Sequence, residues 1–356
     1  MAALNDEQTM LRDMAREWSD NESPVTAFRK LRNAATGAGY DAAAWNAQGE
    51  MGWAGIVIPE EHGGSAFGWL SLGLVLEQLG RNLSASPLAA TATAAAVIAS
   101  AGSAEQQAVW LPKIASGEVI ATLAIDEGPV HDPAKIGTSV GDGKLSGTKA
   151  FVAEGDGAGL FVVAASDGLY LVDGAVEGIT RATRKMADSR SHAQVTFDGA
   201  PADKLGGPEL IARASDLAAA ATCAEMLGLA LAAFEQTNDY LKVRVQFGQQ
   251  LATFQALQHR MAKMFTELEL MRSVVEGALE AIDANRSDVA QAVSLAKAVG
   301  GDTLKLVSRE MVQLHGGIGM TDEHDAGLYM KRAAVLDAMW GNAAYHRERF
   351  AALNGI

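Results

Sequence analysis

The segment from about Pro208 to the end of the chain constrains the fold more than any other part of the sequence. Its apolar residues recur at three- and four-residue spacings, and no proline follows Pro208. Proline inside a helix removes a hydrogen bond and breaks the helix, so its absence allows long helices. We expect these to pack as a four-helix bundle, with helices over residues 216–243, 254–282, 287–314 and 325–353.

In the middle of the chain, the apolar residues follow a different spacing. Short apolar runs alternate there with Gly, Asp or Ser, and they lie at residues 119–125, 160–164, 168–172 and 193–197. Runs of this length between turn residues predict the strands of a small, barrel-like β-domain.

The helical period also dominates from Asn5 to about Ala115. The whole chain is therefore expected to be an α+β multidomain protein. Its expected parts are an N-terminal helical domain (1–117), a middle β-barrel domain (118–206) and a C-terminal four-helix bundle (207–356).

The amino-acid composition of the chain excludes several classes of function. A net charge of −14 argues against nucleic acid or an anionic membrane surface as a partner, because either would be repelled. The single cysteine, Cys223, excludes an internal disulfide and fits the cytoplasm. The sequence opens without the apolar stretch of a signal peptide, and its longest apolar stretch, near residues 88–101, is expected to be a buried helix and not a membrane span.

Two motifs at the ends of expected bundle helices are the most specific features. Arg244-Val-Gln-Phe-Gly248 is followed by Gln255, and Gln313-Leu-His-Gly-Gly-Ile-Gly319 lies further along the chain. In this order and at this spacing they resemble motifs of the acyl-CoA dehydrogenases, flavoproteins that desaturate the α,β-bond of acyl thioesters. The resemblance covers nearly the whole chain, because further segments are similar to that family at residues 52–64, 110–118 and 147–152.

The resemblance implies an FAD cofactor that straddles a subunit interface and is reached by the bundle of a neighbouring chain. Arg244 would then pair with the pyrophosphate, Phe247 would pack on the adenosine side, and Gln255 would offer an amide. Gln313 and the Gly316–Gly317 turn would bring backbone N–H groups to the cofactor, where a Cβ would obstruct approach. The alternative is that Arg244 is a solvated helix residue and that the two glycines only end a helix.

The half of the flavin site that a family member supplies from its own β-domain is altered here. Family members carry Thr-Glu-Pro and then a Gly-Ser-Asp-like loop after the first strand, but this chain has Ala124-Ile-Asp-Glu-Gly-Pro-Val-His-Asp-Pro133. Its prolines remove backbone donors. Phe151 stands in place of the common tryptophan beside the flavin, and Ala153 stands where a hydroxyl is usual.

The resemblance also implies a glutamate that removes the α-proton, at one of two places. These places fall on Gly341 and Ala218, and an arginine that steadies the acyl-CoA falls on Ala219. None of these residues can take a proton or bind an anion through its side chain. Glu225 lies two turns further along the helix of Ala218, and we interpret it as a capped or paired carboxylate. We expect no catalytic residue in this chain.

These observations predict the non-catalytic subunit of an α2β2 acyl-CoA dehydrogenase, which completes the FAD site of a catalytic subunit. The substrate implied is the CoA ester of a steroid side chain or another bulky acyl group, held mainly by the partner, with an electron-transferring flavoprotein as acceptor. The alternatives are a self-sufficient homomeric dehydrogenase with a relocated base, such as Glu225 or Asp337, and a scaffold without flavin. No metal site is expected, because metal-ligand spacing is lacking at His315, His324 and His346.

Overall fold

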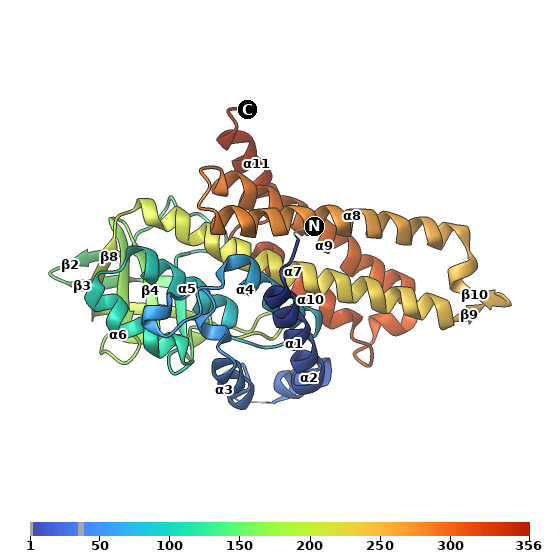
Figure 1. Cartoon of the computed structure of the whole chain (residues 1–356), viewed down its shortest axis with the longest axis horizontal. Coiled ribbons are helices and arrows are strands. Elements are labelled where there is room, and N and C mark those ends of the chain that lie inside the picture. The colour runs from blue at the N-terminus through green and yellow to red at the C-terminus, as the bar shows by residue number, and fades with distance from the viewer. Residues whose placement is uncertain (1–2, 35–38) are drawn as a thin grey trace. The chain divides into compact units, whose positions relative to one another are not determined.

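The computed structural model describes residues 3–34 and 39–356, which form two compact units (Figure 1). The unit that we call the bundle unit consists of Met1–Phe28, Gly73–Ser84 and Thr222–Ile356, and the β unit consists of Arg29–Leu72 and Ala85–Ala221. Three helices contribute residues to both units, namely α2 (Val25–Asn33), α4 (Gly68–Arg81) and α7 (Glu209–Val243).

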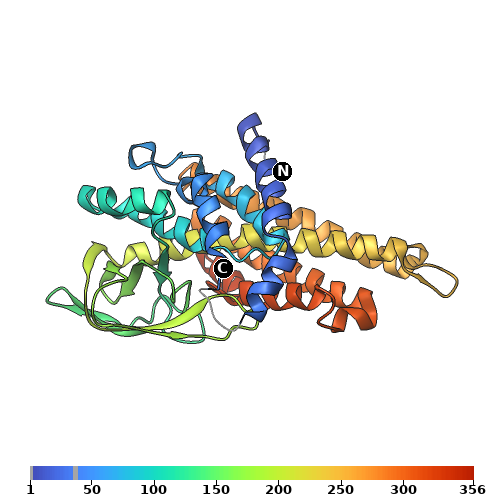
Figure 2. The ribbon, with the colours of Figure 1, turned by 90° about the horizontal axis from the view of Figure 1, so that it is seen from below.

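The β unit contains two four-stranded sheets, with strand orders β1-β4-β5-β8 and β2-β3-β7-β6 (Figure 2). β1 pairs with β4 in parallel, and the other neighbouring strands of these sheets pair antiparallel. The strands are Ala121–Ala124 (β1), Ser139–Gly141 (β2), Lys144–Ala153 (β3), Leu160–Ala165 (β4), Gly168–Asp173 (β5), Ile179–Thr183 (β6), His192–Pro201 (β7) and Asp203–Gly206 (β8).

Burial along the strands explains the apolar runs in the sequence. All of β4 is buried, and so is β5 up to Asp173, which is why these strands are continuously apolar. Phe161 of β4 meets Phe197 of β7 edge to face, with ring centroids 5.7 Å apart, in a core to which both sheets contribute. The predicted middle β-domain is confirmed, and it takes the form of two sheets that share one core.

The N-terminal part of the chain is helical, as the three- and four-residue spacing of its apolar residues predicted. The apolar stretch near residues 88–101 is a buried helix that packs against β1, in agreement with the prediction. A capping box between Ser103 and Gln106 starts the following helix. The helices outside the C-terminal bundle are α1 (Asp6–Glu22), α2 (Val25–Asn33), α3 (Ala42–Glu50), η1 (Trp53–Gly55), η2 (Glu60–His62), α5 (Leu88–Ala101) and α6 (Ala104–Ala115).

The bundle unit contains the predicted long helices, with α9 packed against α8, α10 and α11. One prediction was wrong: residues 325–353 form two helices and not one, because the chain breaks after α10. At the break, Trp340 and Gly341 both have positive φ, of 57° and 90°, which a helix cannot contain. The elements are α7, β9 (Val245–Gln246), β10 (Gln249–Gln250), η3 (Leu251–Thr253), α8 (Gln255–Asp283), α9 (Val289–His315), η4 (Gly316–Met320), α10 (Ala326–Ala338) and α11 (Ala343–Leu353).

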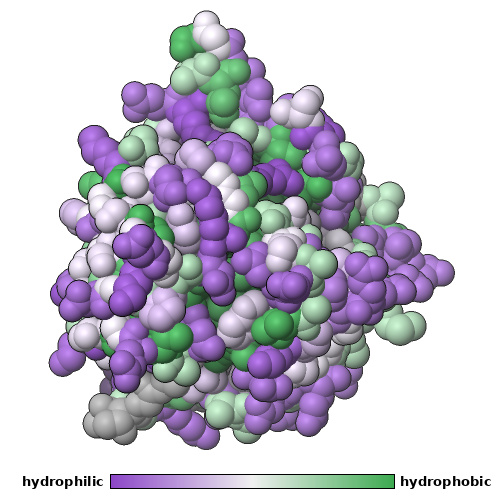
Figure 3. Space-filling view, turned by 90° about the vertical axis from the view of Figure 1, so that its left-hand side faces the viewer, coloured by the Kyte–Doolittle hydropathy of each residue, from purple (hydrophilic) through white to green (hydrophobic). Residues whose placement is uncertain are grey.

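Among the described residues, α7 alone is long and apolar enough to cross a membrane, but 94% of its most apolar window is buried inside the protein. This burial is that of a core helix. The face drawn in Figure 3 mixes hydrophilic residues with separate groups of hydrophobic ones.

Candidate cofactor site

A short hairpin projects beyond the end of α7 and α8, at the right of Figure 1. Gln249 pairs with Gln246 and Gln250 with Val245, so the turn between the strands consists of Phe247 and Gly248. Both turn residues have positive φ, of 53° and 79°, as a tight two-residue hairpin turn requires. Every residue from 242 to 250 is exposed. We call the segment from Val243 to Gln255 the arm.

The arm carries a cation and an apolar tip that its own chain leaves uncovered. Within the described parts of the chain, the Arg244 guanidinium forms no hydrogen bond or ion pair, while its backbone N–H and C=O bond to Tyr240 and Leu251. The Phe247 side chain is 89% exposed, and its ring forms a T-shaped pair with the Phe254 ring, at 6.2 Å between centroids. A fixed backbone with a free guanidinium suits an external anion.

The other predicted cofactor residues lie at the same end of the bundle unit. Gln255 is exposed at the first position of α8, next to Phe254, and Gln313 is exposed in the last turn of α9. Gly316 ends α9 with φ 65° and ψ −140°, a conformation that only glycine adopts readily. A Cβ at Gly316 or Gly317 would meet no atom of this chain within 4 Å, so the space above the turn is open.

One detail differs from the sequence-based expectation. The Gly316 N–H already donates to the Gln313 carbonyl and is not available to a ligand. Gly316 therefore presents a backbone without a side chain, and not a free amide, to the open space above the turn.

Three aromatic rings connect the arm to the glycine turn, and the sequence had not indicated their contact. His315 lies between Tyr240 and His324, with a centroid distance of 4.3 Å to each ring. The Tyr240 hydroxyl also donates to the His315 carbonyl at 3.3 Å. Tyr240 stands one helical turn before Arg244, and that spacing was the only signal in the sequence.

The two places where a catalytic base was expected contain none. Trp340 and Gly341 form a turn that is fixed by Lys297, whose ammonium donates to the carbonyls of Leu336, Asp337 and Gly341 at 2.8–2.9 Å. Burial lowers the pKa of Lys297 to about 8, against the opposing charges of Cys223 and Asp337. Ala218 and Ala219 are buried methyl groups of α7.

The two carboxylates considered as relocated bases have partners within the protein. Both oxygens of Glu225 accept from Arg332, each at 2.8 Å, and both residues are buried. The Asp337 carboxylate accepts from the Ala343 N–H at 3.2 Å, at the start of α11. The interpretation of Glu225 as a paired carboxylate is confirmed.

In the β unit, the loop after β1 is closed on itself by the carboxylate of Glu127. This group accepts from the Gly137 and Thr138 amides at 2.8 and 2.9 Å, from the Thr138 hydroxyl at 2.6 Å and from the Lys149 ammonium at 2.8 Å. Burial alone would raise the pKa of Glu127, but the hydrogen bonds from Lys149, Thr138 and Gly137 lower it to about 2. Lys149 is fully buried and also donates to the Ile125 carbonyl.

The rest of that loop is equally self-contained. His131 donates to the Asp126 carboxylate at 2.9 Å, and the Asp126 carbonyl accepts from Ala150. Phe151 lies at an irregularity of β3 with φ 51° and is 44% exposed. The polar side chains of Asp126, Glu127 and His131 in this loop are thus bonded within the chain itself. The Lys149–Glu127 pair was missed, although a lysine at an inward strand position implies a partner.

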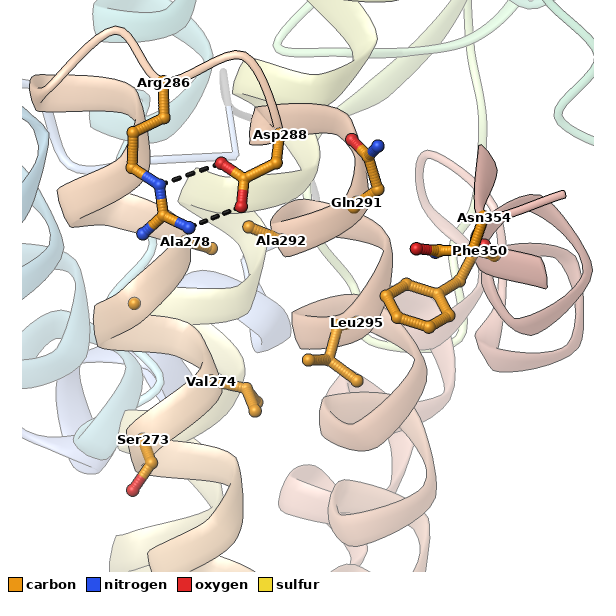
Figure 4. A pocket seen from close by; sticks show the side chains of 11 residues that line it. Ser273, Val274, Ala278, Arg286, Asp288, Gln291, Ala292, Leu295, Phe350 and Asn354 are labelled. Carbon is orange, nitrogen blue, oxygen red and sulfur yellow. Dashed lines mark hydrogen bonds and ion pairs between the residues drawn. The ribbon is translucent and has the colours of Figure 1, made fainter. Parts of the chain in front are cut away.

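Among the described residues, no group of three or more His, Cys, Asp or Glu side chains is placed to hold a metal. A pocket of about 400 Å³ lies among α8, α9 and α11 (Figure 4). Its wall includes Val274, Leu295 and Phe350, and at its rim Arg286 pairs with Asp288. None of the predicted cofactor residues lines this pocket.

The sequence matches two family descriptions. Residues 5–118 match "Acyl-CoA dehydrogenase, N-terminal domain", and residues 206–353 match "Acyl-CoA dehydrogenase, C-terminal domain". Acyl-CoA dehydrogenase IpdE2 of Mycolicibacterium smegmatis is 31% identical over 93% of this chain and 93% of its own length. Acyl-CoA dehydrogenase FadE34 of Mycobacterium tuberculosis is 30% identical over 99% of this chain, but the chain spans only 48% of the length of FadE34.

Solved structures agree. The Tcur3481-Tcur3483 steroid ACAD is 32% identical, with a TM-score of 0.92 and 98% of each chain covered. A chain of the ChsE4-ChsE5 complex from Mycobacterium tuberculosis has a TM-score of 0.92 over 100% of this chain and 99% of its own, at 24% identity, which shows the same fold.

Proposed function

The chain belongs to the acyl-CoA dehydrogenase family, FAD-dependent oxidoreductases that act on CH–CH bonds, and we propose that it is a non-catalytic subunit within that family. In this role its arm completes the FAD site of a catalytic partner chain, in an α2β2 complex. One observation carries the proposal: the arm is exposed with Arg244 unpaired among the described residues, while the loop of the chain's own β unit is closed by Glu127 and Lys149.

The arm fits the outer half of an FAD. Arg244 would pair with the pyrophosphate, Phe247 would pack against the adenosine side, and Gln255 and Gln313 would offer amides. The open Gly316–Gly317 turn allows the cofactor to approach the backbone. FAD supplies the hydride acceptor of the family's reaction, and the residues of this chain only bind and orient it.

The inner half does not fit. The Glu127 carboxylate already accepts four hydrogen bonds, and the Lys149 ammonium is fully buried and donates to Glu127 and Ile125, so neither group is presented to a flavin ring. The absence of a base at Gly341 and Ala218 points the same way, because the family's chemistry needs a proton acceptor beside the substrate.

The relatives support both the assembly and the substrate class. ChsE4-ChsE5 is a complex of two differently named chains, and Tcur3481-Tcur3483 is a steroid ACAD. We propose an acyl-CoA with a steroid side chain or similarly bulky acyl group as substrate, bound mainly by the partner, and an electron-transferring flavoprotein as electron acceptor.

The test compares this chain alone with the chain co-expressed with a candidate catalytic acyl-CoA dehydrogenase from the same organism. We expect flavin absorbance and acyl-CoA turnover only in the complex, with both chains present in equal amounts. Full flavin occupancy and turnover by the chain alone would instead establish the self-sufficient enzyme. A complex whose flavin content and activity are the same with and without this chain would establish the scaffold.

A further inference from the structure

We propose that Tyr240, His315 and His324 are positioning residues that hold the Gly316–Gly317 turn against the base of the arm. This inference rests on the proposed function, because it assigns the three rings a role in FAD binding. We call the three rings the aromatic stack.

The aromatic stack joins three elements that otherwise end separately. Tyr240 belongs to the last turn of α7, His315 is the last residue of α9, and His324 lies just before α10. The ring planes meet at 29° for Tyr240 and His315 and at 46° for His315 and His324, both at 4.3 Å. Aromatic pairs at such distances stabilise their packing beyond the burial of their surfaces.

Through backbone hydrogen bonds, the aromatic stack is connected to the residues that are proposed to bind FAD. The Tyr240 carbonyl accepts from the Arg244 N–H at 2.9 Å, and the Tyr240 hydroxyl reaches the carbonyl of His315, the residue before Gly316. A displacement of Tyr240 therefore moves the guanidinium and the glycine turn relative to each other. Proper spacing between a cation and a backbone cradle decides how well both reach one pyrophosphate.

The hydrogen bonds fix whether Nδ1 carries a proton in each of the two imidazoles. His315 Nδ1 lies 2.7 Å from the Met311 carbonyl, which can only accept, so the ring proton sits on Nδ1. His324 Nδ1 accepts from the Ala326 N–H at 3.1 Å and must therefore lack a proton. Protonating His315 also at Nε2 places a charge on a residue that is 4% exposed.

The neighbours of His315 give it little compensation for a charge. Tyr240 faces it from α7, His324 faces it from the segment before α10, and on α9 it meets the Met311 carbonyl. Burial lowers the pKa of His315, the Met311 bond opposes this, and His324 lowers the pKa further.

The stack should therefore order the turn at neutral pH and release it in acid. A His with a lowered pKa stabilises the folded arrangement above its ordinary pKa, and this contribution is lost as pH falls through that range. The expected consequence is weaker FAD retention by the complex at acidic pH.

Hydrogen exchange of the chain alone tests the stack without any cofactor. The reporters are the Gly316 amide, bonded to Gln313, and the Thr321 amide, bonded to Ile318. We expect Tyr240→Ala to lower their protection about tenfold while Tyr240→Phe, which keeps the ring, lowers it far less. Wild-type protection should fall about tenfold between roughly pH 7.5 and 5.5, and His315→Phe should remove this dependence. The control is His259→Ala, an exposed histidine on α8.

Flavin titration of the complex tests the link to the cofactor. Tyr240→Ala should raise the FAD dissociation constant of the complex about tenfold, whereas His259→Ala should not change it. Protection that is unchanged in Tyr240→Ala, or equally pH-dependent in His315→Phe, overturns the inference. FAD affinity that responds to Arg244→Ala but not to Tyr240→Ala also overturns it and leaves the proposed function intact. Affinity that responds to neither variant refutes the proposed function.

Discussion

Glu225 and Arg332 form a bidentate ion pair inside the bundle unit, with Nε–Oε1 and Nη2–Oε2 distances of 2.8 Å. Both side chains are buried, so the hydrogen bonds between them replace those that each would form with water. A carboxylate in this arrangement stabilises a helix packing and is not free to take a proton from a substrate.

Glu225→Ala should destabilise the chain by about 3–5 kcal/mol, because it leaves the Arg332 charge buried without its partner. It should leave the turnover number of the assembled complex unchanged. Urea unfolding and steady-state kinetics measure the two effects. The matched control is Glu280→Ala, an exposed glutamate on α8. A loss of turnover with unchanged stability would identify Glu225 as a relocated base.

Arg244→Ala should weaken FAD binding by the complex by on the order of 2–4 kcal/mol, because the pyrophosphate loses its counter-charge. Excess FAD should then restore most of the rate, since Arg244 takes no part in proton abstraction. Lys263→Ala, an exposed cation of α8, should have no effect. The assignment fails if the variant keeps its flavin, or if its rate stays low at saturating FAD.

Gly341→Glu should not convert the chain into a dehydrogenase. The backbone φ of 90° disfavours any side chain at this position, and a Cβ would collide with the Tyr345 ring. We expect a loss of about 1–3 kcal/mol in stability and no acyl-CoA turnover by the chain alone. Combining the change with Tyr345→Ala relieves the collision and should still give no turnover. Activity of either variant without a partner chain would contradict the assignment of a non-catalytic role.

Glu127→Gln should destabilise the chain at neutral pH, and this difference should vanish in acid. The folded-state pKa of Glu127, about 2, lies below the ordinary value of 4.5, so its contribution is complete above pH 4.5 and is lost as pH falls toward 2. The Glu127 carboxylate is partly open to solvent, and burial also lowers the pKa of Lys149. Because of both effects, we expect Glu127→Gln to lower the free energy of unfolding by about 1–2 kcal/mol at pH 7.

Urea midpoints of the wild type and of Glu127→Gln between pH 2 and 7 measure this effect. Glu177→Gln, an exposed glutamate of the β unit, is the control and should show a constant, small difference. A Glu127→Gln difference that does not change with pH would show that the loop is held by something other than this carboxylate.

The fold was largely readable from the sequence because its elements depend on local periodicity. Long proline-free segments gave α7, α8 and α9 to within a few residues at their C-terminal ends, and apolar runs gave β4 and β5. The break at Trp340–Gly341 was not readable. It is stabilised by Lys297, which lies far away in sequence, and no local pattern reports such a contact.

The site was readable only in part, for a similar reason. Motifs identified Arg244 and Gly316, whose roles depend on their immediate neighbours in the chain. The aromatic stack and the Lys149–Glu127 pair unite residues from separate elements, so only the folded chain shows them. Glu225 was recognised as paired, but its partner Arg332 was not.

The 89% exposure of the Phe247 ring has a consequence for how cells must produce this protein. A large aromatic group at the tip of a narrow hairpin adheres to other apolar surfaces until its proper partner covers it. A chain synthesised in excess of its partner should therefore self-associate, and its yield should follow the supply of the other subunit. Balanced synthesis of the two chains becomes a condition for solubility as well as for catalysis.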